Sequence, residues 1–224
     1  MSEVAATDYA IVEGEPPELM ARNLRTAAHL LASATVFFFL AFVFGYFYLR
    51  SLNNANLWHP KGVSASQAYG AVVMALTVAS AFLVWLGLLD HRRERRPQWR
   101  VKGGAALAFG LAAIVLQIVE WTQIGFGPAD GGYASIFYGW TAFQVLFAFG
   151  TLFWVENILA TSLRYRNVPS GVPAPGEASG DPHRTAHDIR DPLSLVRPGL
   201  EAVTFYWGFL AGLAVLAWII LYLV

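Results

Sequence analysis

Five long and almost uninterrupted apolar stretches constrain the fold of this chain more than any other feature. They cover residues 24–49, 68–89, 103–126, 133–162 and 202–224. A helix needs about 20 apolar residues to cross a hydrocarbon layer roughly 30 Å thick, because each residue rises about 1.5 Å. The stretches are continuous and lack the alternating pattern of membrane β-barrel strands. The sequence therefore predicts an all-α, polytopic membrane protein that is a bundle of five transmembrane helices.

Charge and proline content divide the chain around these stretches. We expect residues 1–23 to be a cytoplasmic tail, residues 24–166 to hold the first four transmembrane helices with short loops, residues 167–200 to be a Pro/Gly-rich cytoplasmic linker, and residues 201–224 to hold the fifth helix. The N-terminus has neither the basic start nor the short apolar core of a cleaved signal peptide. The closely spaced prolines and glycines of the linker predict a solvated segment.

The distribution of Lys and Arg predicts the orientation of the bundle. Thirteen of these residues lie before or at the start of the first span, between the second and third, or between the fourth and fifth, whereas only Arg50 and Lys61 lie on the opposite side. The positive-inside rule then predicts a cytoplasmic N-terminus and an external C-terminus. At the outer interface we expect an aromatic belt that contains Trp58, Tyr133, Phe137 and Tyr138.

Composition excludes several classes of function. Lys+Arg and Asp+Glu each number 15, so the chain has no basic excess with which to bind nucleic acid. It has no cysteine, which excludes iron–sulfur clusters, thiolate copper centres and thioether-attached haem within this chain. We therefore expect no nucleic-acid partner and no redox cofactor held by this chain.

Histidines are few within the spans. His29 is the only one inside a predicted span, and we expect it to pack against another helix, since one histidine cannot ligate the several metals that a catalytic core would need. His183 and His187 have the spacing that would let a helix direct both rings to one metal ion. The preceding Gly180 and Pro182 disfavour a helix there, so a loop without metal is the preferred interpretation.

Polar side chains inside the spans are the candidate functional residues, because hydrocarbon penalises them unless they are paired or buried in protein. Gln117 and Glu120 lie three residues apart on one helix face, and Trp121 is adjacent. We expect this face to point into protein, with Gln117 donating to a neutral Glu120 that a second helix helps to satisfy. We favour packing over proton handling for Glu120, because the neighbouring sequence supplies no cation.

Other residues of the spans point to packing. For Gln144, Glu156 and Asn157 we expect hydrogen bonds between helices. The second, third and fifth spans are rich in Gly and Ala, which permit close approach of helix backbones. The first span is instead crowded with phenylalanine, which forms a bulky wall toward lipid or a partner subunit.

Five short segments occur in order along the spans. Residues 31–38 read LASATVFF, residues 45–50 GYFYLR, residues 58–62 WHPKG, residues 116–121 LQIVEW and residues 205–209 FYWGF. This order and spacing resemble subunit III of the haem–copper cytochrome c and quinol oxidases, in the shorter five-helix bacterial form. The resemblance covers essentially all of the membrane portion. It adds Tyr206 and Trp207 to Gln117, Glu120, Trp121, Gln144 and Glu156 as candidates for subunit or lipid contact.

The resemblance implies a non-catalytic subunit in a bacterial inner membrane. Such a subunit packs against the catalytic subunit I, which carries the haem and copper, and supports assembly and proton-coupled oxygen reduction. The resemblance also implies phospholipid in a cleft between the first two spans and the other three. The family's polar hallmarks are mostly replaced: its intramembrane glutamate, two fourth-helix histidines, and last-helix histidine and aspartate fall at Ala34, Gln144, Phe147, Gly208 and Ala211.

Three other functions are compatible with parts of the pattern. An accessory subunit of a nitric oxide reductase fits the same resemblance. A small channel or transporter would use Gln117, Glu120 and Gln144 to line a path. A membrane-embedded enzyme would need several His, Asp or Glu residues close to one membrane face, and the spans supply no such cluster.

Overall fold

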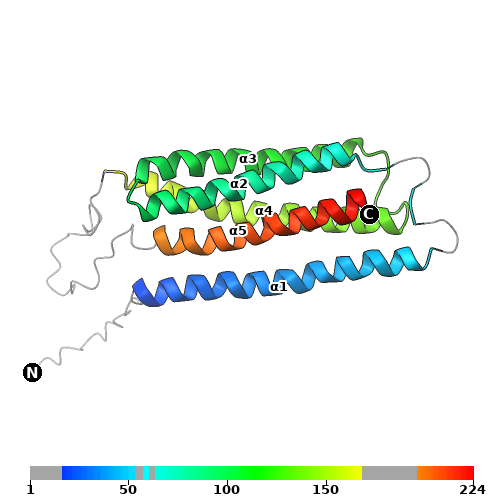
Figure 1. Ribbon diagram of the computed structural model, residues 1–224, viewed down its shortest axis with the longest axis horizontal. Coiled ribbons are helices and arrows are strands. Elements are labelled where there is room, and N and C mark those ends of the chain that lie inside the picture. Colours follow the sequence, from blue (N-terminus) through cyan, green and yellow to red (C-terminus); the bar gives the residue numbers. More distant parts are fainter. Residues whose placement is uncertain (1–16, 54–57, 61–63, 168–195) are drawn as a thin grey trace, which may run out of the picture.

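Five helices run alongside one another in the computed structural model, which describes residues 17–53, 58–60, 64–167 and 196–224. They are α1 (Pro17–Ser51), α2 (Gln67–Arg92), α3 (Arg96–Gln123), α4 (Gly132–Arg164) and α5 (Val196–Trp218), and a π-helical turn, Ile219–Leu223, continues the last. Figure 1 shows an elongated bundle in which the helix axes are nearly aligned. All five helices are long and apolar enough to cross a membrane. The predicted fold class is confirmed.

The helices extend beyond the apolar stretches at the basic end of the bundle. Helix α1 begins at Pro17, ahead of the predicted span 24–49, and α5 begins at Val196, inside the segment predicted as linker. Backbone hydrogen bonding does not stop where hydrocarbon stops, so a helix can continue into water. The rest of the predicted linker, including His183 and His187, lies outside the described residues.

One narrow seam of α1 contacts the rest of the bundle. Its most buried positions alternate in steps of four and three residues: Ala28, Ala32, Thr35, Phe39 and Tyr46, with the half-buried Phe42 between the last two. This spacing places one stripe of the helix against its neighbours, as in a coiled coil. The phenylalanine wall is therefore divided, because Phe39 is buried whereas Phe37 and Phe44 are 75% and 69% exposed.

The neighbours of α1 overturn one expectation. Helix α1 packs mainly on α4 and α5, whereas α2 packs mainly on α3 and α5. Figure 1 shows α5 lying between α1 and α2. The first two helices thus do not form a hairpin apart from the other three, and the predicted lipid cleft at that place is wrong. The small residues of α2 and α3 favour their mutual packing over packing of α2 on the bulky α1.

Small residues bring α2 and α3 into close contact. The buried face of α3 includes Gly103, Ala106 and Gly110, and the Ser80 hydroxyl of α2 donates directly to the Ala106 carbonyl at 2.6 Å. A Cβ on Gly110 would lie 2.6 Å from Leu152 of α4. Glycine at this position therefore lets three helices meet without a gap.

Aromatic residues fill the end of the bundle that carries the C-terminus. Trp58, Tyr133 and Phe137 are 7%, 2% and 0% exposed and pack in one cluster with Trp140. The prediction of an aromatic belt facing the membrane interface is therefore wrong for these residues, since they form a core. The Tyr133 hydroxyl donates to the Leu221 carbonyl inside the protein rather than to a lipid headgroup.

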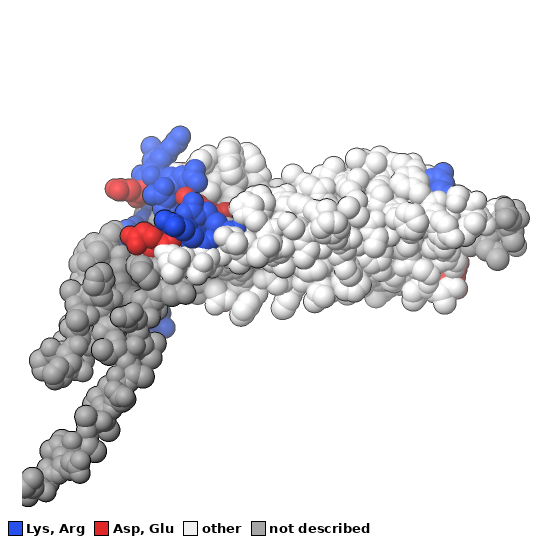
Figure 2. Space-filling view, turned by 90° about the horizontal axis from the view of Figure 1, so that it is seen from below, with Lys and Arg blue, Asp and Glu red and all other residues white. Residues whose placement is uncertain are grey.

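Charges gather at the opposite end. Figure 2 shows Lys and Arg clustered over one end and an almost uncharged surface along the length of the molecule. The turn between α2 and α3 lies there, and Glu94 adopts the left-handed conformation, with φ of 59°, that reverses the chain. This separation of charge accords with the membrane orientation predicted from the sequence.

Candidate functional site

Glu120 is the centre of a hydrogen-bond network at the C-terminal end of α3. Its Oε2 accepts from the Gln117 side-chain amide at 2.8 Å and from the Tyr222 hydroxyl at 2.7 Å. The residue is 4% exposed, and its Oε1 has no partner among the described residues. The spacing of Gln117 and Glu120 thus produces the predicted bond within α3, and the second helix that completes it is the one formed by the C-terminal residues.

Tyrosine and tryptophan side chains extend this network to α4. The Tyr133 hydroxyl donates to the Leu221 carbonyl at 2.7 Å, and the Trp121 indole donates to the Thr141 hydroxyl at 3.0 Å. Each bond joins two different helices. An interhelical hydrogen bond in a membrane contributes about 0.6 kcal/mol on average, so several together fix how the helices pair.

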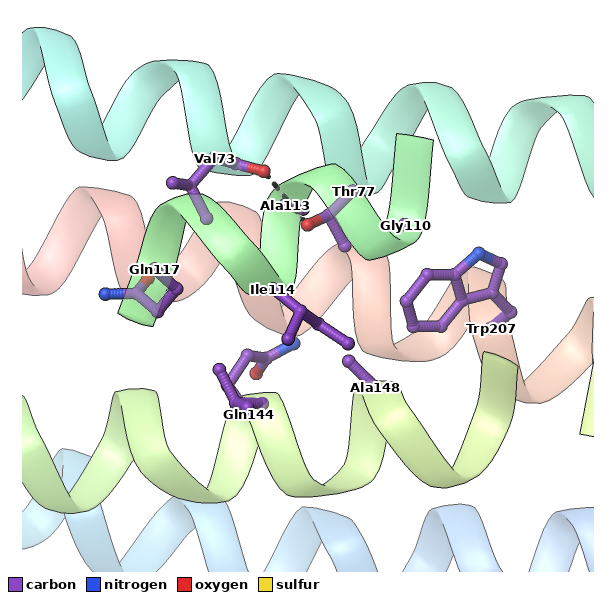
Figure 3. A pocket seen from close by; sticks show the side chains of 10 residues that line it. Val73, Thr77, Gly110, Ala113, Ile114, Gln117, Gln144, Ala148 and Trp207 are labelled. Atoms are coloured by element: carbon purple, nitrogen blue, oxygen red, sulfur yellow. Dashed lines mark hydrogen bonds between the residues drawn. The ribbon is translucent and has the colours of Figure 1, made fainter. Parts of the chain in front are cut away.

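Gln144 joins α4 to α5 deeper in the bundle. Its side-chain amide donates to the Leu210 carbonyl at 3.1 Å, while its Oε1 is buried without a partner. Gln144, Gln117 and Thr77 line one small cavity, and Figure 3 shows them on three different helices.

Tyr206 and Trp207 face two different helices, as adjacent residues on a helix must. The Trp207 indole donates to the Ser80 hydroxyl at 3.0 Å, which connects α5 to α2. The Tyr206 hydroxyl lies 3.0 Å from the Thr35 hydroxyl of α1. Both rings are almost fully buried, at 2% and 1% exposed for Tyr206 and Trp207. This pair therefore holds α5 at the centre of the bundle.

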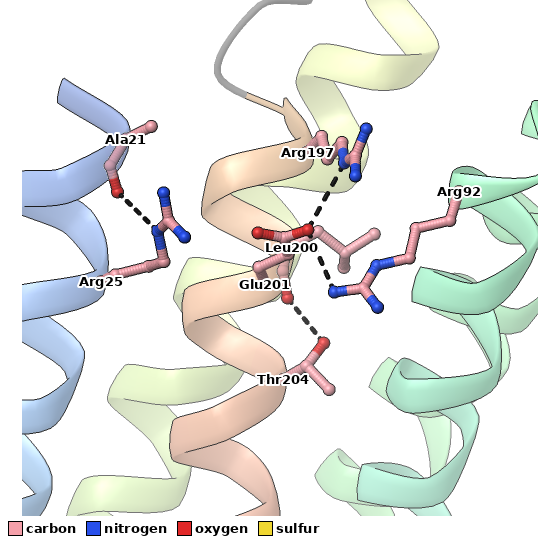
Figure 4. Close-up of polar contacts among 7 residues, drawn as sticks. All are labelled: Ala21, Arg25, Arg92, Arg197, Leu200, Glu201 and Thr204. Carbon is pink, nitrogen blue, oxygen red and sulfur yellow. Dashed lines mark hydrogen bonds and ion pairs between the residues drawn. The ribbon is translucent and has the colours of Figure 1, made fainter. Parts of the chain in front are cut away.

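The basic end carries ion pairs that the sequence did not reveal. Lys102 pairs with the buried Asp90, and Glu201 accepts from Arg92 at 3.1 Å and Arg197 at 3.4 Å. Figure 4 shows Glu201 on α5 between these two arginines. The acids lie near helix ends, close in sequence to many arginines. This proximity was the only sign in the sequence that ion pairs would form. Which arginine reaches which acid depends on the helix arrangement.

Three predicted packing residues behave differently from one another. The His29 ring stacks on Phe205 of α5 at 4.3 Å between centroids, which confirms that it packs on another helix. Asn157 donates to the Phe153 carbonyl within its own helix at 2.8 Å, and Glu156 is exposed. The prediction of interhelical bonds is therefore wrong for Asn157 and, within the described residues, for Glu156. Both lie on the outward side of α4, and composition alone did not distinguish that side.

The described residues contain no group of three or more His, Asp or Glu side chains placed to hold a metal ion. The polar side chains of the bundle are spread over several helix pairs and do not converge on one point. This arrangement joins several pairs of helices.

Comparison with known proteins gives one consistent result. No family model matches the chain. Curated relatives named cytochrome c oxidase subunit 3 do match it. That of Pelomedusa subrufa is 25% identical over 218 residues, which are 94% of this chain and 72% of the relative. Those of Pylaiella littoralis and Ornithorhynchus anatinus are 28% and 25% identical, over 64% and 67% of this chain. The chain spans 55% and 60% of the length of these latter two relatives.

Proposed function

We propose that this chain is a non-catalytic subunit III of a respiratory haem–copper oxidase. The observation that carries the proposal is the similarity to cytochrome c oxidase subunit 3 over 94% of the chain. Haem and copper would reside in the catalytic subunit I, and this chain would stabilise the assembled complex and so sustain proton-coupled oxygen reduction. The use of Trp121, Gln144, Tyr206 and Trp207 to join helices supports a scaffold role.

The outward side of α4 is a suitable surface for the partner subunit. Leu146, Phe149 and Phe153 are 58%, 59% and 61% exposed and lie on one face in steps of three and four residues. Glu156 continues this face at the next step and is also exposed. A carboxylate directed at lipid chains is costly, so we propose that Glu156 meets a polar group of a neighbouring subunit. Phospholipid would cover the remaining apolar surface.

The orientation follows from the cluster of arginines at the inner end. We propose that the N-terminus is cytoplasmic, that the C-terminus is external, and that the membrane is a bacterial inner membrane. A reporter fused after Val224 should be external, and a tag in the turn that contains Glu94 should be cytoplasmic. A cytoplasmic reporter at Val224 would contradict this topology.

Affinity purification of the tagged chain in mild detergent tests the proposed function. The eluate should show the visible absorption of haem and should consume oxygen with a suitable electron donor, and the isolated chain should lack both properties. Purification without haem would overturn the proposal. Nitric oxide consumption in place of oxygen consumption would assign the chain to a nitric oxide reductase instead.

Glu156 variants test the proposed interface. Glu156→Leu should lower the haem recovered per tagged chain several-fold, and Glu156→Gln should lower it less because it retains hydrogen bonding. Asn157→Leu is the matched control, since Asn157 is an exposed neighbour whose amide is satisfied within its own helix. Equal recovery with all three variants would remove Glu156 from the interface.

A further inference from the structure

Two small cavities adjoin one another inside the bundle. They have volumes of about 20 Å³ and about 40 Å³, and Val73, Thr77, Gln117 and Gln144 line both. Figure 3 shows that side chains from α2, α3, α4 and α5 line the smaller one. Thr77 is ten positions into α2, which places it about 15 Å from the outer end of that helix. The cavities therefore lie at a depth where lipid excludes bulk water.

Three polar side chains, Thr77, Gln117 and Gln144, line both cavities, and Thr141 and Tyr222 also line the larger one. Gln144 uses its amide N–H on the Leu210 carbonyl, and its Oε1 is buried without a donor. Thr77 donates to the Val73 carbonyl at 2.9 Å, which leaves the lone pairs of its hydroxyl oxygen to accept. Gln117 donates an amide N–H to Glu120 and also interacts with the Tyr222 hydroxyl. A molecule between Gln144 and Thr77 could donate to both oxygens.

We propose that these cavities bind ordered water, which completes the hydrogen bonding of Gln144 and joins it to Thr77. A water molecule needs about 10–15 Å³ of such volume and two to four polar partners. The smaller cavity has room for about one molecule and the larger for about two or three. Without a donor, the buried Gln144 Oε1 has lost its hydration and gained no hydrogen bond in return, so the water stabilises the bundle.

Tyr222 separates this water from the outer surface. Its side chain lines the larger cavity and also an outer hollow of about 420 Å³ that Tyr133 and His59 line. Water can exchange with the outside when Tyr222 moves. The site does not depend on the proposed function, because any sample that contains the full folded chain can be tested for it.

The first test is a cryo-electron microscopy map of the full chain, in its complex or in a lipid nanodisc, that resolves ordered water elsewhere. Density within hydrogen-bond distance of Gln144 Oε1 and Thr77 Oγ1 is expected. A second map under xenon pressure should show no xenon there, because polar cavities hold water and dry apolar ones bind xenon. An empty wild-type cavity or bound xenon would overturn the proposal without any variant.

A matched pair of variants tests the energetic contribution. Thr77 and Thr151 are both buried and both donate to the carbonyl four residues earlier, but only Thr77 lines the cavities. Thr77→Val should remove the water density and lower the thermal unfolding midpoint by more than Thr151→Val does. Thr77→Ser should retain the density. Equal shifts in midpoint and unchanged density in Thr77→Val would contradict the assignment of Thr77 as a water ligand.

Discussion

The two ends of the bundle hold their polar groups in different ways. At the basic end, Asp90 pairs with Lys102, and Glu201 pairs with Arg92 and Arg197. At the end that carries the C-terminus, Glu120 Oε2 accepts from the amide of Gln117 and the hydroxyl of Tyr222, and no Lys or Arg pairs with Glu120 among the described residues.

Access to water explains the difference. The Lys102 and Arg92 side chains are 32% and 48% exposed, so they reach solvent while their acids lie closer to the core. Long basic side chains can do this at a membrane surface. Glu120 is 4% exposed and lies within the spans, where burying a charge raises the free energy of the protein. Hydrogen bonds to a neutral side chain have a smaller free-energy cost there. The ends should therefore respond differently to loss of an acid.

The largest effect is expected at Asp90. Asp90→Leu leaves the Lys102 ammonium without its partner, and breaking a buried pair destabilises by about 3–5 kcal/mol. We expect the lower limit, about 3 kcal/mol, because Lys102 retains some contact with water. Thermal unfolding of the purified complex measures this loss of stability. The control Arg92→Leu removes an exposed partner and should cost at most about 1 kcal/mol. A similar loss from both variants would mean that burial does not distinguish the two pairs.

Glu120 should show an intermediate effect that depends on shape and not on charge. Glu120→Leu leaves the donors on Gln117 and Tyr222 unpaired and should cost about 1–3 kcal/mol. Glu120→Gln keeps the shape and an acceptor, so assembly and turnover should stay near wild type. The measurements are subunit retention and oxygen consumption. Loss of turnover in a fully assembled Glu120→Gln complex would instead make Glu120 a proton carrier.

A smaller effect is expected midway between the ends, where one hydroxyl pair connects α1 to α5. Thr35→Val and Tyr206→Phe each remove the 3.0 Å bond without changing the shape greatly, and each should cost about 0.6 kcal/mol. The double variant should lose little more stability than either single variant if the two hydroxyls interact only with each other. Strictly additive losses in the thermal midpoint would show that the bond itself contributes nothing.

The smallest effect concerns His59 in the outer loop, whose ring stacks on Tyr133 at 4.0 Å between centroids. Burial, and then the positive charge of Arg50, lower the pKa of His59 below its ordinary value of 6.5. Protonation thus favours the unfolded state. The stabilising contribution is fully present above the ordinary pKa and is lost as the pH falls below it toward the folded-state pKa.

Thermal midpoints between about pH 5 and about pH 8 check this prediction. The wild type should lose slightly more stability than His59→Phe as the pH falls, because phenylalanine keeps the stacking and cannot be protonated. The difference should be small, since His59 is largely exposed. Parallel curves for the two proteins would show that His59 does not contribute to the pH dependence.

The sequence by itself determined the number of helices, the face shared by Gln117 and Glu120, and the end at which positive charge gathers. These features depend on local quantities: the thickness of hydrocarbon, the helical repeat and the cost of charge in lipid. Each can be read within one stretch of chain. The bond from Gln117 to Glu120 is an example, because three residues of helix suffice to bring the two groups together.

Only the tertiary structure decided which helices are neighbours and which side of each helix faces inward. Tyr222 reaches Glu120 across 102 positions of sequence, and Trp207 reaches Ser80 across 127. Glu156 points outward although Gln144, on the same helix, points inward. The spans are apolar on nearly all sides, so the contrast between a polar and an apolar face that orients a helix in a soluble protein is missing. Close packing of small residues between α2 and α3 sets the arrangement instead, and the ion pairs, the outer network and the cavities follow from it.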